Sequence, residues 1–327
     1  MNPKLITMAK KINGITLYTM PECNLNCIYC YAQGLRKENN CLTLTQWQEV
    51  ILQAKGLGAG WIIFAGPGEP LLDNKTLELI KYANTLGMQS ILLTNGTLIT
   101  EGVAENLFLN NTNIIVKLPS FNPEIYNFLS GNKNPIEWVP YEFVYKQKKI
   151  KHYIPFYLDI LLKKYSKFSK GRKRSLRIET VITAYNLKCI IEIAKFIRAH
   201  RLEFLFETLI FNNSVNFDKL IPGKEDYWYL YRELKKYLGF RFILSQNWHK
   251  CPVRNNPVIL QNGDMLLCLV QRAGIGNIRQ NSLRELWEKR LSVKEERLRY
   301  KRFFGFTNCL GRQVCNREES RQGYSIN

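Results

Sequence analysis

The chain has 327 residues, a formal net charge of +20 and nine cysteines, and 46% of its residues are hydrophobic. This length and apolar fraction exclude a disordered or fibrous protein and allow one large domain or two of ordinary size. The sequence shows neither a signal peptide nor an apolar stretch of about 18 residues, so we expect a cytoplasmic protein with no membrane contact. Because the cytosol keeps thiols reduced, the nine cysteines predict metal or redox chemistry rather than disulfides.

Six short runs of β-branched, apolar and aromatic residues predict strands that alternate with helices. The predicted strands are Ile15–Met20, Trp61–Gly66, Ser90–Thr94, Asn113–Leu118, Leu176–Thr183 and Phe204–Phe211. The predicted helices between them are Leu44–Leu57, Lys75–Leu86, Glu101–Leu109, Pro123–Leu129 and Leu187–His200. Six consecutive βα units predict an α/β fold with a parallel sheet, either an open doubly wound sheet or a partial (β/α)6 TIM-like barrel.

The helix ends and the domain boundary also have sequence signals. Thr43 and Asn74 are predicted helix N-caps, and Gly87 is predicted to stop a helix. An insertion at about residues 132–173, partly helical, is either a lid over the carboxyl edge of the sheet or a surface elaboration. The βα pattern ends near residue 222, so we predict one domain over residues 1–222 and a second over residues 223–327, which begins with a helix.

Three cysteines lie close together in the loop after the first predicted strand: Cys23, Cys27 and Cys30. A structural zinc ion requires four ligands, so three thiolates cannot saturate it. A [4Fe–4S] cluster has four irons, and three thiolates leave one iron open to a ligand that is not protein. The spacing therefore favours an iron–sulfur cluster with an open iron site, with a zinc or non-catalytic iron–sulfur loop as the alternative.

This loop, with Tyr29 just before its third cysteine, resembles the signature of the radical S-adenosylmethionine (radical SAM) superfamily, and the resemblance covers at least residues 14–211. It implies that the cluster passes an electron to S-adenosylmethionine, which yields methionine and a 5′-deoxyadenosyl radical. That radical removes a hydrogen atom from an unactivated substrate carbon. The resemblance thus implies an enzyme of the oxidoreductase or epimerase type, in which the cofactors supply the difficult chemistry.

Other motifs match the positions at which this family binds S-adenosylmethionine. Gly66-Pro67-Gly68-Glu69 is similar to the GGE motif, with proline in the middle position, and its glycines let backbone carbonyls approach the amino group of the ligand. The cofactor-binding residues that the resemblance implies are Tyr29, Gly66, Gly68, Glu69, Asn95, Lys117, Ser120, Arg177 and Glu179. Lys117 stands where relatives usually carry a serine. For Arg177 and Glu179, which share one strand face, a structural Arg–Glu ion pair is the alternative.

Four further cysteines lie in the last quarter of the chain: Cys251, Cys268, Cys309 and Cys315. Gly263, Gly276-Asn277 and Ser282-Leu283 around them resemble the SPASM/twitch extension of radical SAM enzymes. The small number of cysteines favours the shorter twitch form with one auxiliary [4Fe–4S] cluster, which implies that all four are metal ligands. The wide spacing of Cys309 and Cys315 leaves a second role open, in which one of them is catalytic and donates a hydrogen atom. A structural zinc is the alternative.

Relatives with this extension mostly modify ribosomally made peptides, so the resemblance implies a peptide substrate that is epimerised, oxidised or cross-linked. A sugar or aminocyclitol is the alternative, because only 22 residues precede Cys23, too few for the leader-binding domain of many peptide maturases. An electron donor such as flavodoxin or ferredoxin is expected. The basic stretch from Lys146 to Arg174 suits an acidic leader or a phosphorylated molecule. It also suggests a remote alternative, a metal-containing nucleic-acid-binding protein, which the three-cysteine loop argues against.

Overall fold

The structure is a computed structural model that describes residues 11–36, 40–132, 134–165, 175–207, 209, 217–238, 256–268 and 273–289. The chain divides into two compact units. The first unit draws on residues 1–22, 32–91 and 249–327, and the second on residues 23–31 and 92–248. One strand, β3 (Gln89–Thr94), begins in the first unit and ends in the second.

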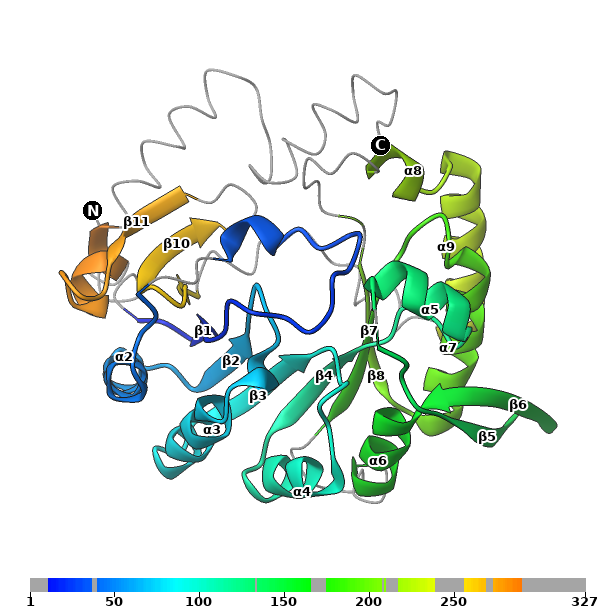
Figure 1. Cartoon of the computed structure of the whole chain (residues 1–327), viewed down its shortest axis with the longest axis horizontal. Coiled ribbons are helices and arrows are strands. Elements are labelled where there is room, and N and C mark those ends of the chain that lie inside the picture. Colours follow the sequence, from blue (N-terminus) through cyan, green and yellow to red (C-terminus); the bar gives the residue numbers. More distant parts are fainter. Residues whose placement is uncertain are drawn as a thin grey trace. The chain divides into compact units, whose positions relative to one another are not determined.

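A pair of parallel strands lies at the centre of the first unit. β1 (Gly14–Tyr18) pairs in parallel with β2 (Trp61–Ala65), and α2 (Leu44–Gly56) connects them. Figure 1 shows α2 and α3 (Lys75–Thr85) beside these strands. The core here is apolar, with Ile15, Leu17, Trp47, Ile62 and Phe64 all buried. Two short 3-10 helices, η1 (Gln33–Leu35) and η2 (Pro70–Leu72), lie in the loops after β1 and β2.

Three strands from late in the chain extend this sheet next to β1. They are β9 (Val258–Ile259), β10 (Asp264–Cys268) and β11 (Ala273–Asn277), in the order β11-β10-β9-β1. β9 is parallel to β1, whereas β10 is antiparallel to both β9 and β11. After β11 the chain buries Leu286 and Trp287, and the backbone N of Leu283 donates to Gln53 Oε1 of α2 (2.8 Å). The described part of the C-terminal segment is therefore built onto β1 and α2.

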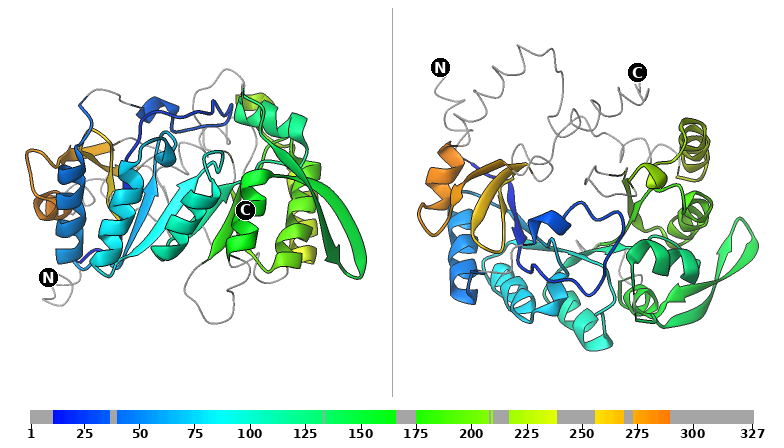
Figure 2. Two further views of the ribbon diagram at one scale, coloured as in Figure 1. Left: turned by 60° about the horizontal axis from the view of Figure 1, so that its bottom comes forward. Right: turned by 45° about the horizontal axis from the view of Figure 1, so that its top comes forward.

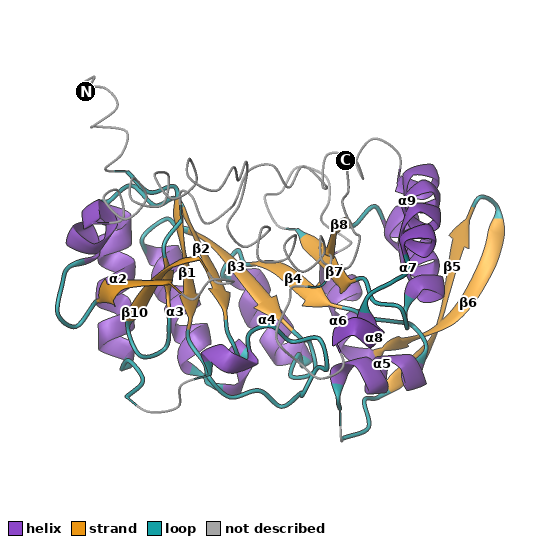
Figure 3. Ribbon diagram, turned by 90° about the horizontal axis from the view of Figure 1, so that it is seen from above, coloured by secondary structure: helices purple, strands orange, loops and turns teal. Residues whose placement is uncertain are grey.

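The second unit contains three adjacent parallel strands in the order β4-β7-β8. Their bounds are β4 (Asn113–Lys117), β7 (Leu176–Val181) and β8 (Glu203–Glu207). The helices of this unit are α4 (Glu101–Leu109), α5 (Pro123–Ser130), α6 (Phe156–Tyr165), α7 (Leu187–His200), α8 (Phe217–Leu220) and α9 (Lys224–Leu238). Figure 3 shows α7 and α9 side by side. The predicted boundary at residue 222 lies between α7 and α9, which pack on each other. The division of the chain at this residue stays a prediction.

The predicted insertion contains a hairpin as well as a helix. β5 (Trp138–Tyr145) pairs with β6 (Lys148–Pro155), and α6 follows directly. Figure 2 shows this hairpin extending past the helices of the second unit. One face of the hairpin packs on α7, where Phe143 lies edge-on to Phe196 (5.5 Å between ring centroids). The prediction of a partly helical insertion is confirmed by α6, but it missed the hairpin.

The predicted elements agree with the observed ones to within one or two residues at most ends. Thr43 forms a full capping box with Gln46, and Gly87 has a φ of +67°, so both of these predictions are confirmed. Asn74 is the N-cap residue of α3, as predicted, but its side chain makes no capping hydrogen bond. Asp73 caps this helix instead, since its Oδ1 accepts from the backbone N of Lys75 (2.9 Å).

Candidate functional site

The cysteine loop, residues 23–31, is held by the end of α5. The backbone N of Asn26 donates to Ser130 O (3.0 Å), and the backbone N of Ile28 donates to Leu129 O (3.0 Å). Gly131, which ends α5, has a φ of +56°, and a Cβ there would lie 2.1 Å from Asn26 O. Glycine is therefore required at this point, both for its backbone conformation and for the close approach of the loop.

The three thiols of this loop lie close enough to affect one another electrostatically. Cys23, Cys27 and Cys30 are partly exposed, and within the described part of the chain none of them forms a disulfide. Burial raises the pKa of the Cys27 thiol to about 12, and the charges of Cys30 and Cys23 act in the same direction. A thiol whose pKa is raised in this way, such as Cys27, binds as a thiolate when a cationic centre compensates the negative charge. This donor set fits a [4Fe–4S] cluster held by three cysteines.

The structure places the side chain of Asn95 beside the cysteine loop. Its side-chain amide donates to Cys23 Sγ (3.9 Å) and to Asn24 Oδ1 (2.9 Å). The backbone N of Leu25 also donates to Cys23 Sγ (3.4 Å). Asn95 thus lies beside the predicted iron ligand, and its role as a direct ligand of S-adenosylmethionine stays a prediction.

A cluster of three charged side chains lies at β4, β7 and β8. Lys117 Nζ forms an ion pair with Glu179, whose side chain is only 3% exposed, and Glu207 hydrogen-bonds to the same carboxylate. Burial by itself lowers the pKa of Lys117, but the carboxylates of Glu179 and Glu207 raise it above its ordinary value. Burial and the charge of Glu179 raise the pKa of Glu207 to about 8. Lys117 and Glu207 end their strands, at the edge where parallel sheets bind ligands.

The structure brings some predicted residues to this cluster and places others elsewhere. Arg177 pairs with Glu203 (2.6 Å from Nη2 to Oε2) at the start of β8, which matches the structural alternative. Ser120 is fully buried, and its hydroxyl accepts from the backbone N of Asn122 (2.8 Å). Removal from water raises the pKa of Tyr29 well above its ordinary value, as does the neighbouring Cys27. For these three residues, cofactor binding stays a prediction.

In the first unit, the glycine loop (residues 66–69) is held by backbone contacts. The backbone N of Gly68 donates to Met20 O (3.1 Å), and that of Glu69 donates to Glu22 O (2.8 Å). A Cβ on Gly68 would lie 1.8 Å from Glu22 O, so only glycine fits. The carbonyl of Pro67 accepts from Arg36 Nε (2.9 Å).

Glu69 follows these glycines and turns away from solvent. Its side chain is 2% exposed, and Oε1 accepts from the backbone N of Leu71 (3.1 Å), which caps η2. A capping role is thus visible for Glu69. Its predicted role in cofactor binding, like that of Gly66 and Gly68, stays a prediction.

The C-terminal cysteines are mostly beyond what the structure describes. Cys251, Cys309 and Cys315 lie outside the described residues, and of Cys268 only the backbone, at the end of β10, is placed. Near it, Gly263 has a φ of +89°, and Asn277 Nδ2 donates to Asp264 Oδ1 (3.0 Å). The ligand roles of all four cysteines stay predictions.

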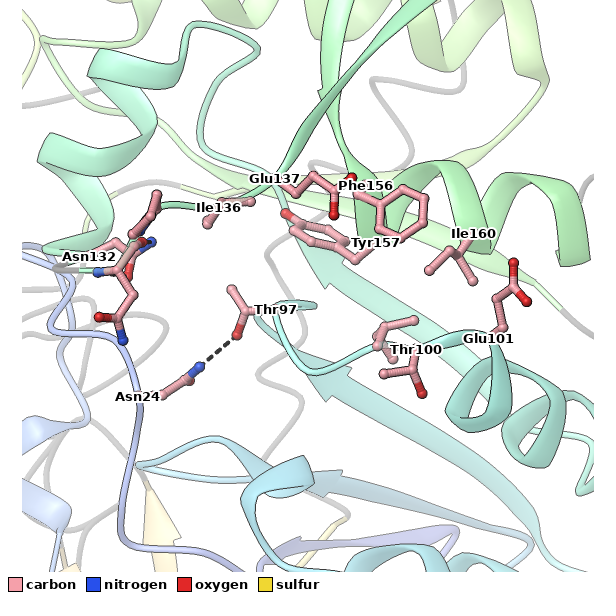
Figure 4. Close-up of a pocket in the computed structure, with 13 residues that line it drawn as sticks. Asn24, Thr97, Thr100, Glu101, Asn132, Ile136, Glu137, Phe156, Tyr157 and Ile160 are labelled. Carbon is pink, nitrogen blue, oxygen red and sulfur yellow. Dashed lines mark hydrogen bonds between the residues drawn. The ribbon is translucent and has the colours of Figure 1, made fainter.

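A cavity of about 450 Å³ lies in the second unit, between the start of α4, the start of α6 and residues 132 and 134–137. Its lining includes Asn24, Thr97, Thr100, Glu101, Glu137 and Tyr157. Figure 4 shows Asn24 and Thr97 facing each other at one end of the cavity, where Asn24 Nδ2 donates to Thr97 Oγ1 (2.7 Å). The cavity therefore reaches the residue that follows Cys23.

Sequence reasoning identifies Glu207 as a charged residue in an apolar strand but gives it no role in the site, and it does not select Asn24 or Thr97. The signal for Glu207 was available, because a carboxylate in an apolar strand must be paired or protonated. Asn24 and Thr97 carry no such local signal, since polar residues in loops are usually solvated. Their contact joins positions 73 residues apart and becomes visible only in the folded chain.

Comparison with known proteins is consistent with this site. Residues 17–139 match the family model of the radical SAM superfamily, and residues 251–316 match SPASM, an iron–sulfur cluster-binding domain. Over 125 residues the chain is 32% identical to a probable GTP 3′,8-cyclase of Methanothermobacter thermautotrophicus. That match covers 37% of this chain and 40% of the relative.

Two solved structures share the fold. SuiB of Streptococcus suis, bound to S-adenosylmethionine, has a TM-score of 0.62 and 18% identity, over 85% of this chain and 66% of that chain. Native anSMEcpe with bound S-adenosylmethionine has a TM-score of 0.60 and 15% identity, over 84% of this chain and 80% of that chain. These similarities support the predicted TIM-like α/β fold. No helix among the described residues has the length and apolar character to span a membrane.

The two family matches agree with the two predicted groups of cysteines. The first match includes Cys23, Cys27 and Cys30, and the second begins at Cys251 and extends past Cys315. Together these domains imply [4Fe–4S] clusters and S-adenosylmethionine as cofactors. The chain therefore carries a radical SAM domain over residues 17–139 and a C-terminal SPASM domain over residues 251–316.

Proposed function

We propose that this radical SAM enzyme cleaves S-adenosylmethionine reductively at the cysteine loop and removes a hydrogen atom from a carbon of its substrate. The observation that carries the proposal is the gathering of three thiols in one short loop, where burial and the charges of Cys30 and Cys23 raise the pKa of Cys27. When bound, the [4Fe–4S] cluster and S-adenosylmethionine supply the electron and the 5′-deoxyadenosyl radical. The protein supplies the ligands, the charge and the exclusion of water.

The charged cluster of the second unit supports a role in ligand binding. The ammonium of Lys117, on a side chain that is 30% exposed, is oriented by the buried carboxylate of Glu179. Because the pKa of Glu207 is about 8, its carboxyl group holds a proton at neutral pH, and the three groups together are then close to neutral. Lys117 can thus donate hydrogen bonds to an oxygen of a ligand without a full positive charge being added to the site.

For the C-terminal cysteines, we propose an auxiliary [4Fe–4S] cluster held by Cys251, Cys268, Cys309 and Cys315, in agreement with the SPASM match. The number of auxiliary clusters, one in the twitch form, belongs to the proposal. In the epimerase variant of the proposal, either Cys309 or Cys315 donates a hydrogen atom instead of binding iron. Flavodoxin or ferredoxin is the proposed electron donor.

We propose a ribosomal peptide as the substrate, which is epimerised, oxidised or cross-linked. SuiB has been solved with its precursor peptide SuiA, and anSMEcpe with the Cp18Cys peptide, and both share the fold of this chain. The outward face of the β5–β6 hairpin supports the proposal, because the strand register places exposed Lys149, Lys151 and Tyr153 on the same face as exposed Val144. Glu142 lies on this face as well and pairs with Lys149 (3.2 Å), so the two lysines leave a net positive charge there. A basic face with apolar side chains suits an acidic peptide segment. The sugar or aminocyclitol alternative stays a prediction.

Iron content and cofactor cleavage test the activity. We would measure iron and sulfide per chain after anaerobic reconstitution, and S-adenosylmethionine cleavage with dithionite, for the wild type and for the Cys23/Cys27/Cys30→Ala variant. We expect about eight irons to fall to about four, with cleavage abolished. About four irons in the wild type and none in the variant would remove the auxiliary cluster. A wild type that binds iron but cleaves no S-adenosylmethionine would overturn the proposed activity.

Peptide binding at the hairpin has a separate test. We would measure the fluorescence anisotropy of a labelled glutamate-rich peptide with the wild type and with Lys149→Gln/Lys151→Gln. We expect the variant to bind about tenfold more weakly, and binding to weaken further as salt is added. The matched control is Lys235→Gln/Lys236→Gln on α9, which removes the same charge from another exposed surface. Equal losses in the two variants would contradict a specific role of the hairpin.

A further inference from the structure

Three side chains beside the first cysteine form a closed ring of hydrogen bonds. Asn95 Nδ2 donates to Asn24 Oδ1 (2.9 Å), and Asn24 Nδ2 donates to Thr97 Oγ1 (2.7 Å). Thr97 Oγ1 in turn donates to Asn95 Oδ1 (2.7 Å). Each member of the ring is therefore both a donor and an acceptor, which restricts the rotamers of all three side chains.

The orientation of the Asn95 amide follows from its neighbours. The backbone N of Thr97 donates to Asn95 Oδ1 (2.9 Å), and a backbone N–H cannot accept a hydrogen bond. The amide oxygen must therefore face Thr97, which directs the NH2 group the other way. One of its two N–H groups meets Asn24, and the NH2 group also lies 3.9 Å from Cys23 Sγ.

The backbone at Asn95 is fixed by the fold. Gly96 has a φ of +85°, and its backbone N donates to Thr94 Oγ1 (3.0 Å). A Cβ on Gly96 would lie 2.5 Å from the ring of Tyr157 and 2.8 Å from Val116 Cγ2. Any other residue at position 96 would push this turn away from Tyr157, so the Thr-Asn-Gly sequence places Asn95 without help from a ligand.

We propose that Asn95 is a positioning residue for the Cys23 thiolate, held by the Asn24–Asn95–Thr97 ring so that its amide N–H points at the sulfur. The proposal rests on the proposed function, because it assigns Cys23 as an iron ligand. A hydrogen bond to a ligand sulfur stabilises the more negative, reduced cluster and raises its reduction potential. The ring also orders the cysteine loop before iron binds.

A substitution at Thr97 can break the ring of hydrogen bonds without a change at the cysteine loop itself. The Thr97 side chain is half-buried at one end of the cavity (Figure 4), so a change there does not disturb a closed core. Thr97→Val has nearly the same shape but loses the hydroxyl that both accepts from Asn24 and donates to Asn95. Thr97→Ser keeps that hydroxyl and is the matched control.

The first readout uses the cluster-free protein. We would measure hydrogen exchange of the backbone amides of residues 23–31 in the wild type, Thr97→Val and Thr97→Ser. We expect about tenfold faster exchange in Thr97→Val, because two hydrogen bonds that order the loop are lost. Thr97→Ser should exchange as the wild type does. This readout does not depend on iron or on activity.

The second readout is the reduction potential of the N-terminal cluster in the reconstituted full chain, from a redox titration followed by electron paramagnetic resonance. We expect the equilibrium constant for reduction to fall about tenfold in Thr97→Val, which equals a shift of about 59 mV to more negative potential for one electron. Asn95→Ala, which removes the donor itself, should shift the potential in the same direction. If Thr97→Val does not fold, the potential of Asn95→Ala still tests the proposal.

Two outcomes would overturn the proposal. Wild-type exchange and potential in both Thr97→Val and Asn95→Ala would show that the ring does not act on the loop. Faster exchange with an unchanged potential would show that it orders the loop but does not act on Cys23. A wild type that binds no iron would instead count against the proposed function, and the exchange experiment would still decide whether the ring orders the loop.

Discussion

The cysteine loop and the glycine loop follow β1 and β2 in the chain, and both are held by backbone hydrogen bonds, yet they differ in the space that they leave for side chains. In the glycine loop, backbone meets backbone, and there is no space for a side chain at Gly68. In the cysteine loop, α5 holds the backbone at Asn26 and Ile28, whereas the thiols stay partly exposed.

This difference separates two kinds of sensitivity to substitution. The shape of the glycine loop depends on the absence of a Cβ atom at Gly68, so an added methyl group there should disrupt its structure. The function of the cysteine loop depends on the sulfur atoms themselves, so their replacement should break the chemistry and leave the fold intact. The charged cluster at Lys117 lies between these extremes, because the carboxylate of Glu179 is buried whereas the side chain of Lys117, for which we propose ligand binding, is partly exposed.

The largest effect is expected at the sulfur ligands. Cys27→Ser should reduce S-adenosylmethionine cleavage to background, because serine does not replace a thiolate ligand of iron. The free energy of unfolding of the cluster-free protein should change by less than about 1 kcal/mol, since the two side chains have nearly the same size. Urea denaturation and a cleavage assay check both points. Cleavage of S-adenosylmethionine by Cys27→Ser would contradict the view that the cysteine loop acts through its sulfur atoms.

The next effect is steric and structural. Gly68→Ala should lower the free energy of unfolding by about 3 kcal/mol, because the new Cβ meets the backbone carbonyl of Glu22. The matched control is Gly56→Ala in α2, where a Cβ meets nothing within 4 Å. That control should be neutral or stabilise the helix by up to about 1 kcal/mol. Equal stability of the two variants in urea denaturation would be inconsistent with a glycine loop held by close backbone contact.

Removal of the buried ion pair should have a smaller effect. Lys117→Met should cost about 2 kcal/mol of unfolding free energy, because the buried carboxylate of Glu179 is left without its cation. Adding Glu179→Gln should recover part of this loss, since no uncompensated charge then remains. Thermal or urea unfolding of the single and double variants gives the coupling. A double variant that is less stable than both single variants would argue against this account.

The last effect appears as a change of stability with pH rather than as a single loss. The pKa of Glu207 is about 8 in the folded chain against an ordinary value of 4.5, so between these values the folded state holds a proton that the unfolded state releases. The contribution of Glu207 to stability is therefore greatest below pH 4.5 and falls as pH rises towards 8. Glu207→Gln lacks this dependence, so its stability relative to the wild type should increase across that range.

Melting temperatures between pH 5 and 8 measure this trend. The exposed Glu225, on α9, supplies the control, because Glu225→Gln should change little relative to the wild type over the same range. A constant difference between Glu207→Gln and the wild type at all pH values would show that Glu207 ionises normally.

Much of the fold was predictable because its signals are local. Helices α4 and α7 begin and end at the predicted residues, since apolar periodicity and end signals depend on neighbours in the sequence. The β5–β6 hairpin was not predicted, because its lysines and aromatic residues resemble a solvated insertion until one face packs on α7. The addition of β9 next to β1 joins residues more than 200 positions apart, and no local pattern carries such a pairing.

By itself, the sequence determined the loop of three cysteines, the alternation of strands and helices and the resemblance to the radical SAM superfamily, because each rests on residue types at short spacings. The tertiary structure alone decided that Lys117 pairs with Glu179, 62 residues away, with Glu207 sharing that carboxylate. It also decided that Asn95 turns its amide towards Cys23, 72 residues away. These contacts depend on which strands are neighbours and on how loops pack at their ends, and both are set by the burial of the whole apolar core.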